Sequence, residues 1–129
     1  MANFLKFVEL ADDLSALGLV WKPAVGDEVS SRQDPTLISV LVEPQAMSIE
    51  DLKRVYIWLP TFEQMVVQSE ARQMILEHAG LELNEREMFY KTLLVGKLGK
   101  VEGRGDSLRL SIGRALADLL VVSNPKFFN

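Results

Sequence analysis

Hydrophobic residues recur every three or four positions in three long segments of the chain, and this spacing predicts three amphipathic helices. The segments are residues 3–17, 61–79 and 107–122. We expect the first to end at Gly18 and the second at Gly80, because glycine favours the backbone conformation that follows a helix. The apolar positions of 61–79 spread over two sides, which predicts a helix that is deeply buried or contacts a partner.

Shorter segments between these helices are rich in β-branched and aromatic residues, which favour strands. We expect a short strand near residues 27–32, a second over 36–43 and a third over 55–60. Pro44 and Pro60 close the last two, since proline has no N–H to donate within a sheet.

Two polar pairs match the pattern of helix starts, where a side-chain oxygen accepts from a free backbone N–H of the first turn. Ser48, with Asp51 three residues later, predicts a short helical turn. Thr61 with Gln64 predicts a capping box at the start of the 61–79 helix.

Residues 84–96 match two patterns. Asn84 with Glu87 is typical of a helix cap, whereas the run FYKTLLV has the composition of a strand. We interpret residues 88–96 as a strand, and the helix stays open as the alternative.

The order of these elements predicts an α+β fold in a single domain over residues 1–129. Because short connections join the early strands, we expect a compact layered sandwich with three main helices packed on a small mixed or antiparallel sheet. The strand ending in Trp58-Leu59-Pro60, the helix that holds Gln64 and the closing Gly-x-Gly-x-Ser segment with its Ala-rich helix resemble small bacterial and phage-type proteins over residues 55–122. The resemblance implies a layered α+β sandwich and no particular activity.

Composition narrows the classes of function. The chain has no cysteine, which excludes disulfides, thiolate catalysis and cysteine-based metal sites, and favours a reducing compartment. The first residues, MANFLKFVELADDL, lack the basic region and cleavage site of a signal peptide, and no apolar run is long enough to span a bilayer. We therefore expect a cytoplasmic protein without a membrane partner.

The net charge of −4 is unevenly distributed along the chain. Residues 1–90 carry a net charge of −8, whereas residues 91–129 carry +4. An acidic body argues against nucleic-acid binding, which needs a contiguous basic surface. The basic part is suited to a small anion or to an acidic patch on another subunit, unless folding mixes the two parts.

The glycine-rich segment GKLGKVEGRGDSLRL, residues 96–110, has two interpretations. The phosphate-loop and dinucleotide-binding patterns are both absent from it, so we expect a turn or hairpin over Gly99–Gly105 and a helix cap at Asp106 or Ser107. In the alternative, backbone N–H groups and cations bind a small anion. The candidate anion ligands are Lys97, Lys100, Gly103, Arg104, Gly105, Ser107 and Arg109.

The residues that carry catalysis or bind metals are few. His78 is the only histidine, and its place in the last turn of the 61–79 helix predicts an interaction with the helix dipole. The acidic groups Glu9–Asp13 and Glu82–Glu87 are typical of solvated faces. The sequence therefore predicts a protein that is not an enzyme, with no catalytic residue, metal site or cofactor.

The favoured hypothesis is a non-enzymatic interaction or assembly module that forms a homodimer or binds another protein. The broad apolar face of 61–79 and the aromatic C-terminus motivate it. Trp21 and Trp58 are expected in the core, with a ligand pocket as the alternative. The second hypothesis is a small domain that binds an anionic ligand through residues 97–109. The predicted interface residues are Met65, Val67, Met74, Phe127 and Phe128.

Overall fold

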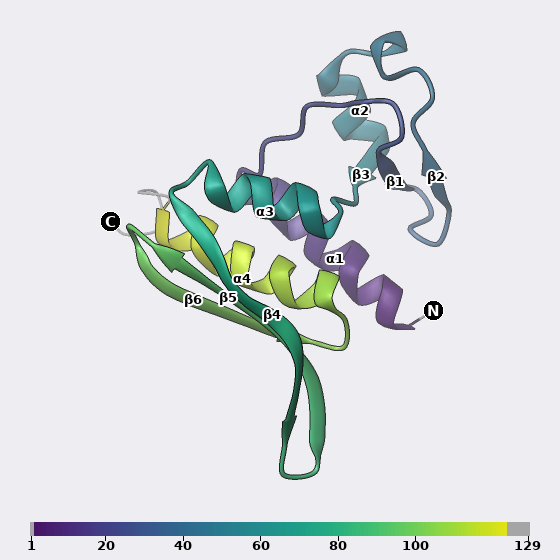
Figure 1. Ribbon diagram of the computed structural model, residues 1–129. Helices are drawn as coiled ribbons and strands as arrows, with labels where there is room; N and C mark the ends of the chain where they lie inside the picture. The colour runs from purple at the N-terminus through teal and green to yellow at the C-terminus, as the bar shows by residue number, and fades with distance from the viewer. Residues whose placement is uncertain (1, 124–129) are drawn as a thin grey trace.

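The computed structural model describes residues 2–123, so Phe127 and Phe128 lie outside the described residues (Figure 1). In this range the chain forms four α-helices, one 3₁₀ turn and six strands. The helices are α1 (Ala2–Ala16), α2 (Ile49–Val55), α3 (Phe62–Glu70) and α4 (Leu108–Ser123), and the 3₁₀ turn is Pro44–Ala46. The strands are β1 (Glu28–Ser31), β2 (Ile38–Val40), β3 (Tyr56–Trp58), β4 (Met74–Asn84), β5 (Glu87–Gly96) and β6 (Gly99–Gly105).

The strands form two antiparallel sheets of three strands each, in the orders β2-β1-β3 and β4-β5-β6. The α+β class and the antiparallel pairing are confirmed, although the structure has two sheets where one was expected and a fourth helix. Figure 1 shows α4 lying along one face of the β4–β6 sheet, and α1 and α3 both contact α4. None of the helices in residues 2–123 is long and apolar enough to cross a membrane.

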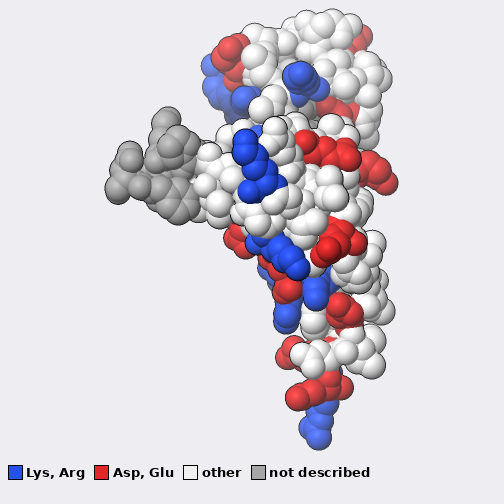
Figure 2. All heavy atoms as spheres, turned by 60° about the vertical axis from the view of Figure 1, so that its left-hand side comes forward, with Lys and Arg blue, Asp and Glu red and all other residues white. Residues whose placement is uncertain are grey.

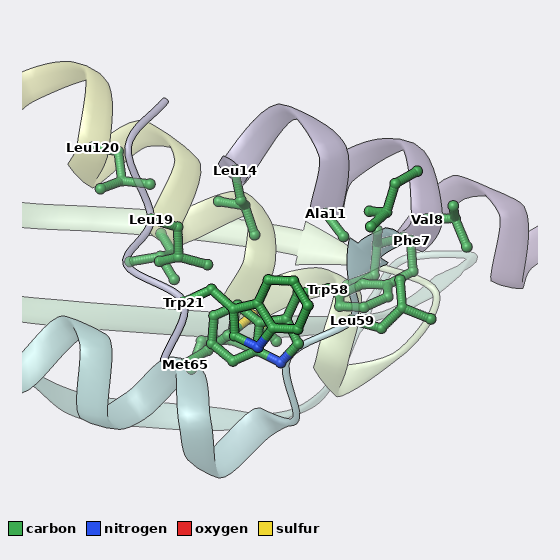
Figure 3. Packing of buried hydrophobic residues seen from close by; sticks show 14 of the residues in the cluster. Phe7, Val8, Ala11, Leu14, Leu19, Trp21, Trp58, Leu59, Met65 and Leu120 are labelled. Atoms are coloured by element: carbon green, nitrogen blue, oxygen red, sulfur yellow. The ribbon is translucent and has the colours of Figure 1, made fainter. Parts of the chain in front are cut away.

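The hydrophobic core lies where α1, α3 and α4 meet the β2-β1-β3 sheet (Figure 3). Trp21 and Trp58 are both buried there, with parallel rings whose centroids lie 6.0 Å apart. The core prediction for both tryptophans is therefore confirmed. Other members of the core cluster are Phe7, Val8, Ala11, Leu14, Leu19, Leu59, Met65, Leu116, Leu119 and Leu120.

Arg109, at the start of α4, connects this helix by hydrogen bonds to the β2-β1-β3 sheet and to the residues that follow β3. Its guanidinium donates to the carbonyl oxygens of Leu59 (2.6 Å) and Pro60 (2.8 Å) and to Glu28 Oε1 (2.8 Å). It also lies 4.5 Å from the centre of the Phe7 ring, within range of a cation–π interaction. Here a cation of the basic part pairs with an acid of the acidic part, so folding mixes the two parts of the chain at this point.

The predicted helix over 61–79 is wrong beyond Glu70. Its start is confirmed: Thr61 Oγ1 accepts from the Gln64 N–H at 3.1 Å, and Gln64 Oε1 accepts from the Thr61 N–H at 2.8 Å. After α3 the chain turns through Gln73, whose φ of 64° is left-handed, and enters β4. Pairing of β4 with β5 along almost its whole length outweighs the helical spacing of its apolar residues.

The prediction of a turn or hairpin over Gly99–Gly105 holds only as a hairpin, because these residues form β6, which pairs antiparallel with β5. The turn that joins β5 to β6 lies earlier, at residues 97–98, and Gly99 after it has a left-handed φ of 99°. Ser107 Oγ accepts from the Leu110 N–H at 3.0 Å, so the predicted cap of the last helix is confirmed. Residues 84–96 are confirmed as mainly a strand.

Candidate functional site

The hairpin of β4 and β5 continues beyond the body of the protein (Figure 1). The last residue of β6, Gly105, pairs with Tyr90, and beyond that pair β5 has β4 as its neighbour alone. We call residues 81–90, the two-stranded extension together with the Leu81–Tyr90 pair at its base, the arm. It ends in a turn at Glu85, whose φ is 54°.

The arm has two chemically different faces, because successive side chains of a strand point to opposite sides. Thr92 points toward α4, where its hydroxyl lies 2.7 Å from Ser111 Oγ. Counting from Thr92 and its partner Ala79 along each strand, the same side of the arm carries no charged residue. This inner strip consists of Leu81, Leu83, Met88 and Tyr90.

Three of the four residues of the inner strip are exposed, and Tyr90, at the base of the arm, is partly buried. Leu81 is 54%, Leu83 73% and Met88 69% exposed, whereas Leu94, on the same side of the same sheet beneath α4, is fully buried. Leu83 and Met88 are direct cross-strand partners at the end of the arm. Large apolar side chains that lie together and exposed mark an interaction site more often than single exposed ones do.

The outer side of the sheet carries a ladder of ion pairs. Lys91 Nζ lies 3.5 Å from Glu82 Oε1 and 3.7 Å from Glu102 Oε1, and Arg104 donates to Glu102 Oε2 at 2.7 Å. The Arg104 guanidinium also lies 4.7 Å from the centre of the Phe89 ring in the arm. Figure 2 shows acidic and basic atoms alternating down one side of the projecting arm, with white atoms along the other.

Within this ladder the pKa of Glu102 lies below its ordinary value of 4.5, chiefly because Arg104 donates a hydrogen bond to the carboxylate. The charges of Arg104 and Lys91 act in the same direction, and partial burial opposes them. His78, on β4 and not on a helix, has Nε2 3.7 Å from Glu82 Oε1.

The predicted anion ligands point to different sides of the protein. Gly103 and Gly105 face α4: a Cβ on Gly103 would overlap the Ser111 carbonyl and the Ala115 N–H, and one on Gly105 would touch Leu110. Arg104 points to the outer side of the same strand, and Arg109 points to β3. Ser107 caps α4, and Lys97 and Lys100 are exposed near the β5–β6 turn.

The predicted interface residues also separate. Met65 and Met74 are fully buried in the core of the chain, whereas Val67 is 61% exposed. None of the predicted interface residues belongs to the inner strip of the arm. In the sequence, the inner strip is indicated by the alternation Leu81-x-Leu83 and Met88-x-Tyr90, which is typical of a strand with one apolar side.

In residues 2–123 no group of three or more histidine and acidic side chains is placed to hold a metal ion. Comparisons of the chain with protein-family models, with curated proteins and with solved structures found no match. The arm is therefore the candidate site on the strength of its own geometry: a projecting hairpin with an uncharged, mostly exposed inner strip.

Proposed function

We propose that this protein is a non-enzymatic assembly module that self-associates through the inner strip of the arm. The observation that supports the proposal is the exposure of Leu81, Leu83 and Met88 on one uncharged side of a projecting hairpin. Burial of apolar surface is the main favourable term in protein association.

A second copy of the chain is the occupant that fits the strip. In a two-fold dimer the same patch meets itself, so the patch must be complementary to itself. A strip without charged residues meets this condition, whereas the outer side, with its ordered ladder of acids and bases, requires one particular register. Face-to-face packing of two arms would pair the strips and leave both ladders in solvent.

The strip is short, and the expected affinity follows from its size. Stable interfaces bury about 800 Å² per partner, and weak ones bury less. An interface of four side chains from each copy belongs to the weak class. We therefore expect a dimer that dissociates at micromolar concentration, which corresponds to a free energy of association of about −8 kcal/mol.

The experiment is sedimentation velocity from low micromolar to near-millimolar protein, with wild type and Leu83→Glu. The wild type should shift from monomer to dimer, and the variant should stay monomeric, because a two-fold interface would then bury a pair of like charges. Val42→Glu is the matched control, since Val42 and Leu83 are both 73% exposed and Val42 lies outside the arm. A monomeric wild type, or equal effects of the two variants, would overturn the proposal.

The second hypothesis, an anion bound by residues 97–109, is proposed with less support. Lys97 and Lys100 have no ion pair within residues 2–123 and are the two candidates without an intramolecular role. Phosphate should raise the melting temperature if they bind it, and Lys100→Ala should then remove the rise.

A further inference from the structure

A groove of about 730 Å³ lies beside α3, outside the arm and outside residues 97–109. Val20, Val67 and Ala71 form its apolar lining together with the Trp58 ring. The two valines are 50% and 61% exposed, whereas Trp58 is buried. The groove thus has an apolar wall, a buried aromatic residue and the size of a small-molecule site, which is about 300–1,000 Å³.

The two stacked tryptophans differ in their hydrogen bonds. Trp21 Nε1 donates to Asp27 Oδ2 at 2.9 Å, whereas Trp58 Nε1 is buried and has no partner in the described structure. In Figure 3 both indole nitrogens lie on the edge of the ring pair nearer α3. Because Trp58 lines the groove and Trp21 is not among its lining residues, a ligand bound there changes the surroundings of the Trp58 indole more directly.

Two cations, Arg72 and Lys22, line the groove. Arg72 uses one nitrogen, Nη1, to donate to the carbonyl oxygen and the Oε1 of Gln68, at 2.8 and 3.0 Å. Neither Arg72 nor Lys22 has an ion pair within residues 2–123. Partial burial lowers the pKa of Arg72, as expected of a charge that lacks a counter-charge. The free side of a guanidinium fork matches a carboxylate.

One acid, Glu63, also lines the groove, at the other end of α3 from Arg72. A ligand with an anionic group at both ends would therefore place one of them near a like charge. A ligand with one anionic group and an apolar body matches both the cations and the valines of the groove.

We propose that the groove beside α3 binds an amphipathic monocarboxylate, with its carboxylate on Arg72 and its apolar body over Val20 and Val67 toward Trp58. Gln68 fixes the arginine, because Gln68 Nε2 donates to the Val20 carbonyl oxygen at 2.6 Å while Gln68 Oε1 accepts from Arg72. The site is independent of the arm, so the proposal does not rest on self-association.

The experiment is a nuclear magnetic resonance titration of the full chain with decanoate below its micellar concentration. The chain has two tryptophans and so gives two indole N–H signals. The Trp58 signal should shift to a saturating value, with a larger change than the hydrogen-bonded Trp21 signal shows. Decanol, which lacks the charge, and decanedioate, which carries a second one, should each bind at least about tenfold more weakly, or 1.4 kcal/mol.

Two variants test the two ends of the ligand. Arg72→Gln should weaken decanoate binding at least about tenfold, and Val67→Asp should abolish saturation, because it places a second acid in the groove. Arg86→Gln is the matched control for the loss of one positive charge, since Arg86 is exposed at the tip of the arm. The proposal fails if decanoate causes no saturable shift, if decanol binds equally well, or if Arg86→Gln and Arg72→Gln weaken binding alike. The monomeric variant Leu83→Glu should bind decanoate as the wild type does, which separates this outcome from that of the arm.

Discussion

The β4–β5 hairpin has two parts that share strands and alternation but differ in what covers them. Beneath α4, the inner side of the sheet carries Thr92, Leu94 and Gly103, and all three are buried. In the arm, the same side carries Leu83 and Met88, which are 73% and 69% exposed. The outer ladder crosses from one part to the other, since Arg104 contacts both Glu102 and the Phe89 ring.

The two parts of the hairpin differ in the size of the inner side chains at the points where α4 approaches the sheet most closely. Where α4 lies directly on the sheet, Gly103 lets the helix backbone approach the strand and Gly105 leaves room for the Leu110 side chain. The hydroxyls of Thr92 and Ser111 meet there at 2.7 Å. Where α4 is absent, the side chains are large. The sheet thus has small residues where α4 approaches most closely, buries Leu94 beside them, and carries only large residues on the inner side of the arm, where they offer apolar surface.

The largest expected effect is that of Gly103→Ala, which tests the close approach of helix and sheet. The new Cβ would overlap backbone atoms of Ser111 and Ala115, which move only if α4 shifts. Overpacking of this kind costs about 3 kcal/mol of unfolding free energy. Urea denaturation at low protein concentration measures it.

The matched control is Gly80→Ala in β4, the other outer strand of the same sheet. A Cβ there would meet only the His78 ring, at 3.5 Å, and Gly80 does not have the left-handed backbone that resists alanine. We expect a change within about 0.5 kcal/mol of wild type, the range typical of unconstrained surface sites. Equal losses in the two variants would contradict the idea that α4 sets the size limit.

A smaller effect is expected from Thr92→Val, which removes the hydroxyl pair under α4 and keeps the shape of the side chain. Ser111 Oγ also donates to the Leu108 carbonyl oxygen at 2.8 Å, so Thr92 is the donor of the pair. Loss of a buried hydrogen bond costs about 1 kcal/mol of unfolding free energy.

A double-mutant cycle with Ser111→Ala isolates the Thr92–Ser111 interaction, because the residues are in contact and their effects should not add. Additive losses would show that the hydroxyl pair does not couple β5 to α4. The close fit between α4 and the sheet would then depend on the glycines alone.

Local chemistry made parts of this structure predictable. Ser48, Thr61 and Ser107 each cap a helix as their side chains indicate, because a cap depends on groups three residues apart. The antiparallel α+β class followed from short connections between strands. These features need no knowledge of distant parts of the chain.

Long-range pairing decided what the sequence could not show. In β4 the register shifts between Leu76 and His78, so the apolar positions before and after Glu77 fall out of strict alternation. The apolar residues 75, 76 and 79 therefore lie three and four positions apart, as in a helix. The turn before it uses Gln73 in a left-handed conformation, where a glycine or asparagine would have given a signal.

The candidate site was only partly predictable for the same reason. An apolar strip in 81–90 is visible in the sequence, but its exposure depends on where α4 begins relative to the end of β6. For Gly103 and Gly105 the sequence favoured a turn or hairpin, with an anion site as the alternative, because their contact with α4 is not visible in the sequence. Their role comes from a helix that follows them in the chain and folds back on them.

The smallest expected effect belongs to Glu102→Gln, which tests whether the outer ladder matters to either part of the hairpin. The folded-state pKa of Glu102 is lowered, so its contribution to stability is fully present above the unfolded value near 4.5 and is lost as pH falls through the lowered folded value. Because Glu102 and Arg104 are 37% and 55% exposed, solvent screens the pair, and the variant should lose roughly 0.2–1 kcal/mol at neutral pH. Arg104→Gln should lose a similar amount, and the double variant no more than either. Urea denaturation at neutral and strongly acid pH measures the loss of unfolding free energy. A loss that persists in acid would assign the effect to packing against the Phe89 ring. The outer side of the sheet would then differ between the arm and the part beneath α4, as the inner side does.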